Sequence, residues 1–244
     1  MIATLTALLL AHALADFALQ TDWINANKTR LPALLLHGAI VWLTAHAALG
    51  LVYDPWLSAL ALAHVLIDAT KVQLARRLNG FRGIGAFLAD QGAHLLTLLI
   101  VARLAPDLWQ GGAWAGMDAL LPLYALLAGL VVTLTAGQYA VGLLMRPHSR
   151  RVRNDGLRDG GRLIGLLERG LIYLLILAGQ PLGVGFLIAA KSILRFGTAT
   201  RDQRSAEYVI IGTLASFGWA IAVALGVQAL LTALPPLEIG ARGP

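Results

Sequence analysis

Long apolar runs, separated by short polar connections, are the feature of this sequence that most limits its fold. Several runs reach the roughly 20 residues that an α-helix needs to cross the hydrocarbon core of a membrane. Only 13% of the 244 residues are charged and 58% are hydrophobic, whereas soluble domains contain about 25% charged residues. The sequence therefore predicts an all-α, polytopic integral membrane bundle.

Eight apolar segments are predicted to form transmembrane helices. They cover residues 2–20, 33–52, 57–76, 86–105, 118–144, 162–179, 182–196 and 207–233. The first is interpreted as a retained helix because its first cations follow the apolar run instead of preceding it. The seventh is short and contains Lys191, so a re-entrant segment is the alternative to a full crossing there.

Basic residues collect in alternate connections. Two, three, six and three Lys or Arg residues follow the first, third, fifth and seventh segments, whereas the other connections and the tail contain only Arg103 and Arg242. The positive-inside rule places the basic connections in the cytoplasm and both termini outside. A full crossing of the seventh segment keeps this pattern and is preferred. The basic residues that give the net charge of +6 are thus expected to set the orientation in the membrane and to contact anionic lipid headgroups. Membrane lipids are the expected partners, and no nucleic acid is expected.

The histidines divide the chain into two parts. Five of the six lie within residues 1–110, which are predicted to form a four-helix membrane unit. Residues 111–244 are predicted to form a second four-helix unit that contains a basic cytoplasmic loop at 146–162. A weak repeat with the pattern His-x-Leu-x-Asp relates residues 8–16 to residues 60–68, in two helices that run in the same direction.

Three His–Asp pairs with a spacing of four residues form the candidate site. A spacing of four returns to the same helix face about 6 Å along the axis. In the first and third predicted helices, which run towards the cytoplasm, His comes before Asp. In the fourth, which runs away from it, Asp comes before His, so every pair places its Asp nearer the cytoplasm. This order predicts one layered site near the cytoplasmic face, and the pairs are His12 with Asp16, His64 with Asp68, and Asp90 with His94.

Three further polar residues extend this layer, and one histidine lies outside it. Lys71 follows Asp68 by about one turn, Gln91 is next to Asp90, and His37 lies near the predicted depth of Asp16. His46 lies nine residues after His37, about 180° around the same helix. His37 is therefore a possible additional site residue, and His46 is left out.

The charges of this layer suggest a metal ion. Asp16, Asp68 and Asp90 against Lys71 leave about two negative charges, which are costly to bury in lipid. A divalent cation would neutralise them, and imidazole with carboxylate ligands suits zinc, manganese or iron. Two other interpretations stay open. The same groups could relay protons, or a Lys71–Asp90 ion pair and His–Asp hydrogen bonds could simply join the helices.

Four charged residues of the second half lie near predicted cytoplasmic helix ends. Long charged side chains at such positions readily reach the membrane interface. They can form two neutralising pairs that fix helix packing, or they can bind a phosphate-bearing headgroup above the site. The pairs would be Glu168 with Lys191 and Arg195 with Glu207.

Several segments resemble a bacterial membrane protein family, the domain of unknown function 3307. The similar segments are LLLAHALADFALQTDW, LPALLLHG, HVLIDATKV and FLADQGAHL, so the resemblance covers roughly residues 3–105. The segments from IGLLERG to KSILRF and AEYVIIGTLASFGWA resemble the C-terminal extension of longer members. The resemblance implies a multi-pass protein of the bacterial inner membrane and carries over no activity.

The leading hypothesis from the residues is a membrane-embedded, metal-dependent hydrolase that acts on a lipid or lipid-linked substrate. His12, His64 and His94 with one or more aspartates would hold the metal. A remaining carboxylate would act as general base, and Lys71 or Gln91 would stabilise developing negative charge. A proton- or ion-coupled transporter and a non-catalytic membrane scaffold are the alternative hypotheses.

Overall fold

The computed structural model describes residues 1–78, 83–149, 159–199 and 203–236. Within these ranges the regular elements are all helices, as the sequence predicts. The chain divides into two compact units, one of Met1–Val131 with Ala229–Pro244 and one of Val132–Gln228. The boundary predicted near residue 110 lies inside the first of these units.

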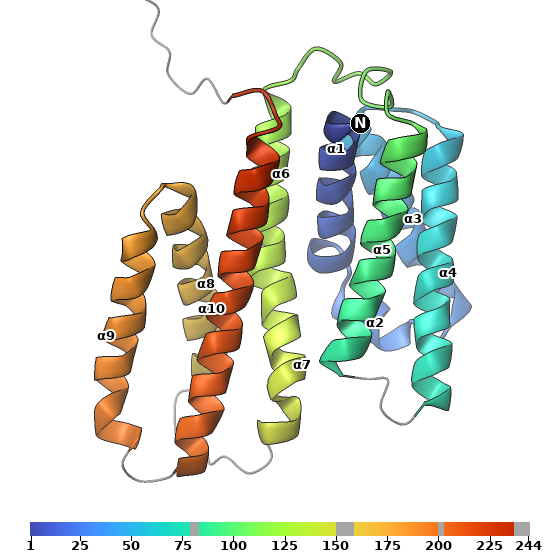
Figure 1. Ribbon diagram of the computed structural model, residues 1–244. Helices are drawn as coiled ribbons and strands as arrows, with labels where there is room; N and C mark the ends of the chain where they lie inside the picture. Colours follow the sequence, from blue (N-terminus) through green and yellow to red (C-terminus); the bar gives the residue numbers. More distant parts are fainter. Residues whose placement is uncertain (79–82, 150–158, 200–202, 237–244) are drawn as a thin grey trace, which may run out of the picture. The chain divides into compact units, whose positions relative to one another are not determined.

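The first unit is a bundle built around its N-terminal helix. Helix α1 packs against α3, α5 and α6, and α4 packs against α3 and α5 (Figure 1). The elements of this unit are α1 (Ile2–Ala13), the π-helix η1 (Leu14–Ala18), α2 (Asp22–Asn27), α3 (Leu31–Leu49), α4 (Pro55–Arg77), α5 (Ile84–Leu104) and α6 (Leu120–Val131).

Local capping signals fix the turn between α3 and α4. Gly50 ends α3 with a φ of 68°, a left-handed conformation that glycine adopts without a Cβ clash. Asp54 then accepts hydrogen bonds from the backbone N–H groups of Trp56 and Leu57, which caps the first turn of α4. Pro55 occupies the first position of that helix, where the backbone N–H that proline lacks would have no partner within the helix. These residues make α3 and α4 an antiparallel pair.

Successive long helices of the first unit alternate in direction. The backbone carbonyl of Pro106, just beyond α5, accepts hydrogen bonds from the N-terminal amine of Met1 at 3.1 Å and from Thr4 Oγ1 at 2.6 Å. The start of α1 therefore lies beside the end of α5, and the cations at the start of α3 and the end of α4 share the opposite end of the unit. The predicted orientation across the membrane, with both termini outside, stays a prediction.

The second unit consists of helices from the C-terminal part of the chain. Helix α9 is one helix of 19 residues, longer than the predicted segment 182–196. Helix α7 extends to Ser149, so Arg146 lies on a helix, while residues 150–158 of the predicted basic loop fall outside the described ranges. The elements are η2 (Val132–Ala136), α7 (Gly137–Ser149), α8 (Gly160–Leu177), α9 (Pro181–Ala199) and α10 (Gln203–Leu231), of which the residues from Ala229 onwards belong to the first unit.

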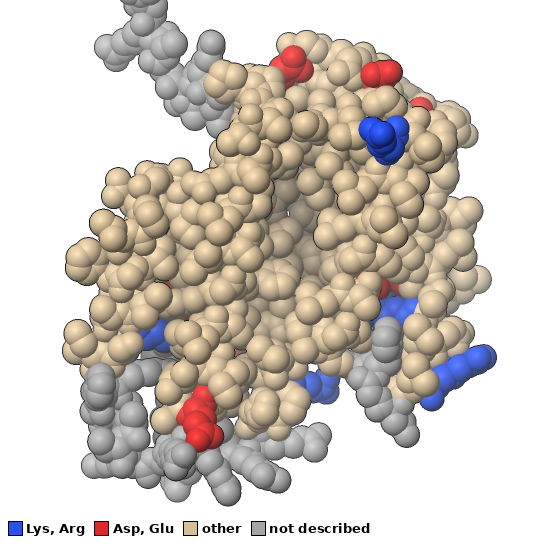
Figure 2. Space-filling model, viewed as in Figure 1, with Lys and Arg blue, Asp and Glu red and all other residues tan. Residues whose placement is uncertain are grey.

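Within the described residues, five helices are long and apolar enough to cross a membrane, which indicates a membrane protein. On the face of α4 and α5 seen in Figure 2, the charged side chains lie near the helix ends. The exact number of eight crossings stays a prediction. The five helices are Leu31–Leu49, Pro55–Arg77, Ile84–Leu104, Leu120–Ser149 and Ala206–Leu231, and two shorter apolar helices are Ile2–Ala18 and Pro181–Ile193.

Gly38 allows α3 and α4 to approach closely beside the candidate site. A Cβ atom at this position would lie 2.4 Å from Val65 Cγ2, which is much shorter than a van der Waals contact and would be a clash. Gly38 follows His37 in α3, and Val65 follows His64 in α4. The close approach of these two helices therefore also brings the two histidines together.

We expect Gly38→Ala to destabilise the protein, because the new methyl group would push α3 away from Val65. Overpacking costs about 1–3 kcal/mol, which outweighs the roughly 1 kcal/mol that alanine gains over glycine in a helix. Gly92→Ala in α5 is the control, since its Cβ would meet nothing within 4 Å. Thermal unfolding in detergent measures both, and equal stability of the two variants would contradict the packing argument.

Candidate functional site

Seven buried His and Asp side chains form one cluster in the first unit. Each is at most 9% exposed, although all are ionisable. Helix α1 with η1, α3, α4 and α5 each contribute at least one of them. The cluster, called the His/Asp cluster below, consists of His12, Asp16, His37, His64, Asp68, Asp90 and His94.

The closest contacts in the His/Asp cluster form a triangle of three atoms. His37 Nε2 lies 3.0 Å from His64 Nε2, and Asp16 Oδ1 lies 3.3 Å from each of these two nitrogens. Four ligands placed tetrahedrally at zinc–nitrogen distances of about 2.0–2.1 Å would lie about 3.3 Å apart. The three atoms are thus spaced as ligands of one small metal ion would be.

A π-helix directs Asp16 into this triangle. The backbone N–H of Leu19 bonds to the carbonyl of Leu14 at 2.8 Å, an i to i+5 hydrogen bond that widens the turn around Asp16. His12 Nδ1 lies 3.9 Å from Asp16 Oδ1. The spacing of four predicts that Asp16 pairs with His12. Asp16 instead lies closer to His37 and His64, which belong to other helices.

Asp68 connects the triangle to a second group of ligand atoms. Its Oδ2 lies 3.6 Å from His37 Nε2 and 3.9 Å from His64 Nε2, while its Oδ1 lies 3.9 Å from His94 Nε2. His94 Nε2 in turn lies 3.6 Å from Asp90 Oδ1. The two oxygens of one carboxylate therefore face two neighbouring sets of possible metal ligands.

Lys28 belongs to the site, although the sequence interpretation used it only as a cation that sets topology. Its Nζ lies 2.6 Å from Asp68 Oδ2, and its side chain is 13% exposed whereas that of Asp68 is 1% exposed. Lys28 follows α2, in which Ile24 is buried. The predicted layer has more negative than positive charges, which indicates that a further cation is needed. Lys28 is the cation nearest to Asp16 in the sequence, so it could have been identified on that ground.

Lys71 and Gln91 lie at the edge of the His/Asp cluster, next to Asp90. Lys71 Nζ contacts Asp90 Oδ2 at 2.6 Å, which is the ion pair considered from the sequence. The Gln91 amide nitrogen donates to Asp90 Oδ2 at 3.3 Å and to Asp16 Oδ2 at 3.4 Å. The amide oxygen of Gln91 lies 3.2 Å from His12 Nε2, so this side chain joins α1 and η1 to α5.

Several buried polar atoms of the His/Asp cluster lack a hydrogen-bond partner. Buried polar groups are nearly always satisfied in native proteins, and exceptions often mark a site for water or an ion. Among the described side chains, one such atom lies in the second unit, on Thr133. The others are His12 Nδ1, Asp16 Oδ1, His37 Nδ1, Asp90 Oδ1 and both ring nitrogens of His94.

His46 is buried apart from the His/Asp cluster, at the other end of α3. Its Nδ1 donates to the backbone carbonyl of Trp42 at 2.8 Å, and its Nε2 accepts from the backbone N–H of Asp54 at 3.1 Å. The Nε2 bond thus connects α3 to the turn before α4, and the Nδ1 bond to the carbonyl four residues earlier fixes the ring. This histidine has a structural role, and it offers a matched control for the histidines of the cluster.

Two charged residues of the second unit form an ion pair that the sequence suggests. Lys191 Nζ lies 2.5 Å from Glu168 Oε2 and 5.2 Å from the centre of the Phe217 ring. This is one of the two pairs considered from the sequence. Glu207 is exposed, and the side chain of its suggested partner Arg195 lies outside the described part of the chain.

Arg169 is a second residue that the sequence interpretation did not identify. It is 2% exposed and donates from Nε to the carbonyl of Thr133 and from Nη2 to that of Leu134. Its Nη1 bonds to Ser216 Oγ at 3.2 Å. Both carbonyls belong to the π-helix η2, whose altered hydrogen-bond pattern leaves them accessible. Arg169 thus satisfies backbone groups inside the second unit.

The comparisons with known proteins cover the part of the chain that contains the His/Asp cluster. Residues 4–112 match the family model described as "Protein of unknown function (DUF3307)". This match confirms the resemblance for the N-terminal half, and it includes every residue of the cluster together with Lys28, Lys71 and Gln91. No curated protein and no solved structure matches the chain.

We expect Lys28→Met to lower the free energy of unfolding by about 3 kcal/mol, because it leaves the Asp68 carboxylate buried without its cation. In protein treated with a chelator, adding Asp68→Asn to this variant should recover most of the loss, since the amide is neutral. Arg30→Met is the control, because Arg30 is exposed nearby in the chain. Unfolding in detergent measures all three. If Lys28→Met is as harmless as Arg30→Met, the ion pair does not stabilise the site.

Proposed function

We propose that this chain is a membrane-embedded, metal-dependent enzyme with hydrolase-like chemistry, acting on a lipid or lipid-linked substrate in the bacterial inner membrane. The triangle of His37, His64 and Asp16 carries the proposal, with its Nε2–Nε2 distance of 3.0 Å and Nε2–Oδ1 distances of 3.3 Å. Two imidazoles and a carboxylate suit zinc, manganese and iron. His37, only a possible additional residue from the sequence, is thus part of the proposed ligand set.

The distribution of charge supports a divalent cation at the triangle. Lys28 pairs with Asp68 and Lys71 pairs with Asp90, so these two aspartates have cations. Among the described residues, Asp16 instead contacts histidines and the amide of Gln91. One net negative charge therefore remains, and it lies on the carboxylate of the triangle. Burying it without a counter-charge would be costly.

Asp68 is the fourth ligand of the proposed metal site. Its Oδ2 approaches both triangle nitrogens to within 3.9 Å, and its contact with Lys28 restrains the carboxylate there. Contacts of this kind orient metal ligands. The rest of the sequence-based ligand set surrounds the triangle and supplies further ligand or proton-transfer groups, namely His12, Asp90 and His94.

The chemistry of such a site is the activation of water, which the ion would bind in a coordination position beyond the four protein ligands. A divalent cation generates a nucleophile from water at neutral pH and polarises a carbonyl or phosphoryl oxygen. Asp90 contacts Lys71 through Oδ2 and lies 3.6 Å from His94 Nε2 through Oδ1, and it is the carboxylate that we assign as general base. Lys71 and the Gln91 amide are the donors that would stabilise negative charge on the substrate.

Metal analysis of the purified protein tests the proposal directly. We expect about one equivalent of a transition metal in the wild type and a loss of most of it in His37→Ala and His64→Ala, because each variant removes a ligand of the triangle. His46→Ala is the control, since it removes another buried histidine outside the cluster. Elemental mass spectrometry measures the content.

A measurement on the unaltered protein separates loss of metal from loss of folding. Chelation should lower the unfolding temperature of the wild type, and re-addition of the metal should restore it, because a ligand bound to the folded state stabilises it. The same chelation should abolish turnover of lipids in membrane extracts, followed by mass spectrometry. A wild type without metal, or triangle variants that keep it, would overturn the metal site.

Proton- or ion-coupled transport is the second candidate, and the continuity of the contacts favours it. From Lys28 through Asp68, His94 and Asp90 to Lys71, each ionisable group lies within 4 Å of the next. Lys28 and Lys71 are the more exposed ends of this row. Both lie towards the same end of the unit, so the row would form only part of a path across the membrane. Chains of ionisable groups inside a membrane protein commonly serve as proton relays.

Proteoliposomes with an imposed pH gradient distinguish transport from hydrolysis. If the chain transports protons, the wild type should dissipate the gradient several-fold faster than empty vesicles, and His94→Ala should remove the difference because it interrupts the row. His46→Ala again serves as the control. A gradient that decays equally in all preparations excludes the second candidate and leaves the enzyme proposal unaffected.

A further inference from the structure

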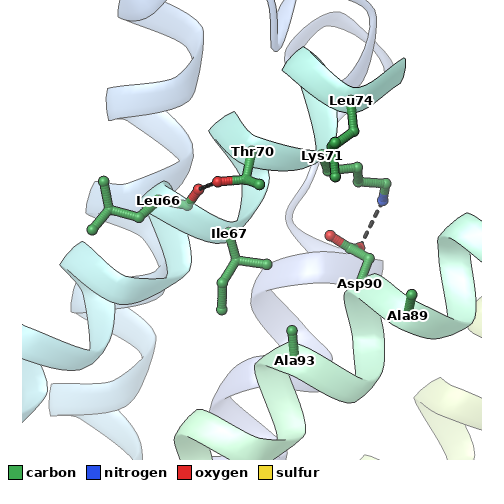
Figure 3. A pocket seen from close by; sticks show the side chains of 8 residues that line it. All are labelled: Leu66, Ile67, Thr70, Lys71, Leu74, Ala89, Asp90 and Ala93. Carbon is green, nitrogen blue, oxygen red and sulfur yellow. Dashed lines mark hydrogen bonds and ion pairs between the residues drawn. The ribbon is translucent and has the colours of Figure 1, made fainter. Parts of the chain in front are cut away.

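An apolar groove lies between α4 and α5 in the first unit. Its volume is about 320 Å³, at the lower end of the roughly 300–1,000 Å³ of small-molecule sites. Leu66, Ile67 and Leu74 of α4 form one wall, and the small residues Ala89 and Ala93 of α5 form the other (Figure 3). The groove exists because alanines face leucine and isoleucine where the two helices pack together.

The polar part of the groove is the Lys71–Asp90 ion pair. Figure 3 shows the Lys71 side chain reaching from α4 towards the carboxylate of Asp90 on α5. The side chain of Lys71 is 31% exposed, whereas that of Asp90 is 3% exposed. An ammonium group has three donors, and Asp90 Oδ2 accepts one of them at 2.6 Å. Lys71 can therefore contact a ligand in the groove without losing Asp90.

Asp90 is the link between the groove and the rest of the His/Asp cluster. Its Oδ1 lies 3.6 Å from His94 Nε2, and its Oδ2 accepts from the Gln91 amide at 3.3 Å. A polar group bound at Lys71 would thus lie one side chain away from the buried histidines. The groove is consequently an approach to the site from the outer face of α4 and α5.

We propose that this groove binds an anionic phospholipid, with an acyl chain along the apolar walls and the phosphate on Lys71. Leu66 is 58% exposed, so a membrane would surround the groove with acyl chains. Lys71 lies six residues before Arg77, the end of α4, which is about 9 Å along the helix axis. A lysine at this depth extends towards the interface, where lipid phosphates lie.

The charge of the site selects an anionic lipid. This step rests on the proposed function, because the cluster with Lys28 and Lys71 has one net negative charge until a divalent cation is bound. The cation would make the net charge positive, and a phosphate group would then neutralise it. A zwitterionic lipid carries its own cation and gains less from Lys71. The groove itself and the position of Lys71 do not depend on the metal.

Native mass spectrometry of the purified full chain, titrated with phosphatidylglycerol or phosphatidylcholine, tests the inference. Phosphatidylglycerol should bind about tenfold more tightly to the wild type than to Lys71→Gln, the equivalent of one charge-assisted hydrogen bond. Binding of phosphatidylcholine should change much less. The new amide can still donate to Asp90, so this variant keeps a partner for the buried carboxylate.

A second variant tests the apolar walls without touching the ion pair. Ala89→Leu should fill the groove and weaken binding of both lipids several-fold, because the acyl chain loses its space. Ala59→Leu is the matched control, since Ala59 is an exposed alanine of α4 that lies outside the groove. Equal binding of the two lipids by the wild type, or binding unchanged in Lys71→Gln and Ala89→Leu, would overturn the lipid site.

Metal content measured on the same samples separates this inference from the proposed function. Lys71→Gln and Ala89→Leu should keep the metal of the wild type, because neither removes a ligand of the triangle. Lipid binding that depends on these residues in a protein without metal would support the groove and refute the metal-dependent enzyme. Bound metal together with lipid binding that ignores both residues would refute the groove alone.

Discussion

The burial of ionisable side chains inside an apolar helix bundle is the constraint on which the first unit depends. Each charge removed from water must be paired or neutralised, because an uncompensated charge costs several kcal/mol or more. Lys28 on Asp68 and Lys71 on Asp90 meet this requirement for two carboxylates. Helices with only leucine and alanine would contain no buried charge that needs a partner, so they could pack through other faces. The polar cluster therefore dictates which faces of α1, α3, α4 and α5 must meet.

The sequence predicts the helices and most of the cluster because both depend on local periodicity. Apolar runs of about 20 residues locate the long helices, and a spacing of four places His64 with Asp68, and Asp90 with His94, on one helix face. The lateral contacts between helices are not encoded in any such spacing. The approach of His37 to His64 depends on the absence of a side chain at Gly38, which becomes informative only once the helix neighbours are known.

Departures from regular helix geometry explain what the sequence did not reveal. The π-helix η1 turns Asp16 towards His37 and His64, so the spacing rule describes this pair incompletely. In the second unit, the π-helix η2 exposes carbonyls that accept from Arg169 and, at Val132, from the Trp219 indole. Periodicity assumes a regular helix, in which a buried arginine would have no backbone partner. Backbone carbonyls are partners that no pattern of side chains can indicate.

The remaining distinction in the site is between a proton and a metal ion at Asp16. Its carboxylate has two imidazole nitrogens at 3.3 Å and, within the described residues, contacts no lysine or arginine. A single proton on one imidazole would balance the charge and give a hydrogen-bonded structure. The ring nitrogens of His94 and the Oδ1 atom of Asp90 have no hydrogen-bond partner in the described part of the chain, and they do not distinguish the two cases because neither a proton nor a metal ion at the triangle contacts them. A divalent cation instead uses several ligand atoms at once and makes the site electropositive. That sign of charge would also strengthen the binding of a phosphate beside Lys71, so a metal ion at the triangle would favour an anionic lipid in the groove.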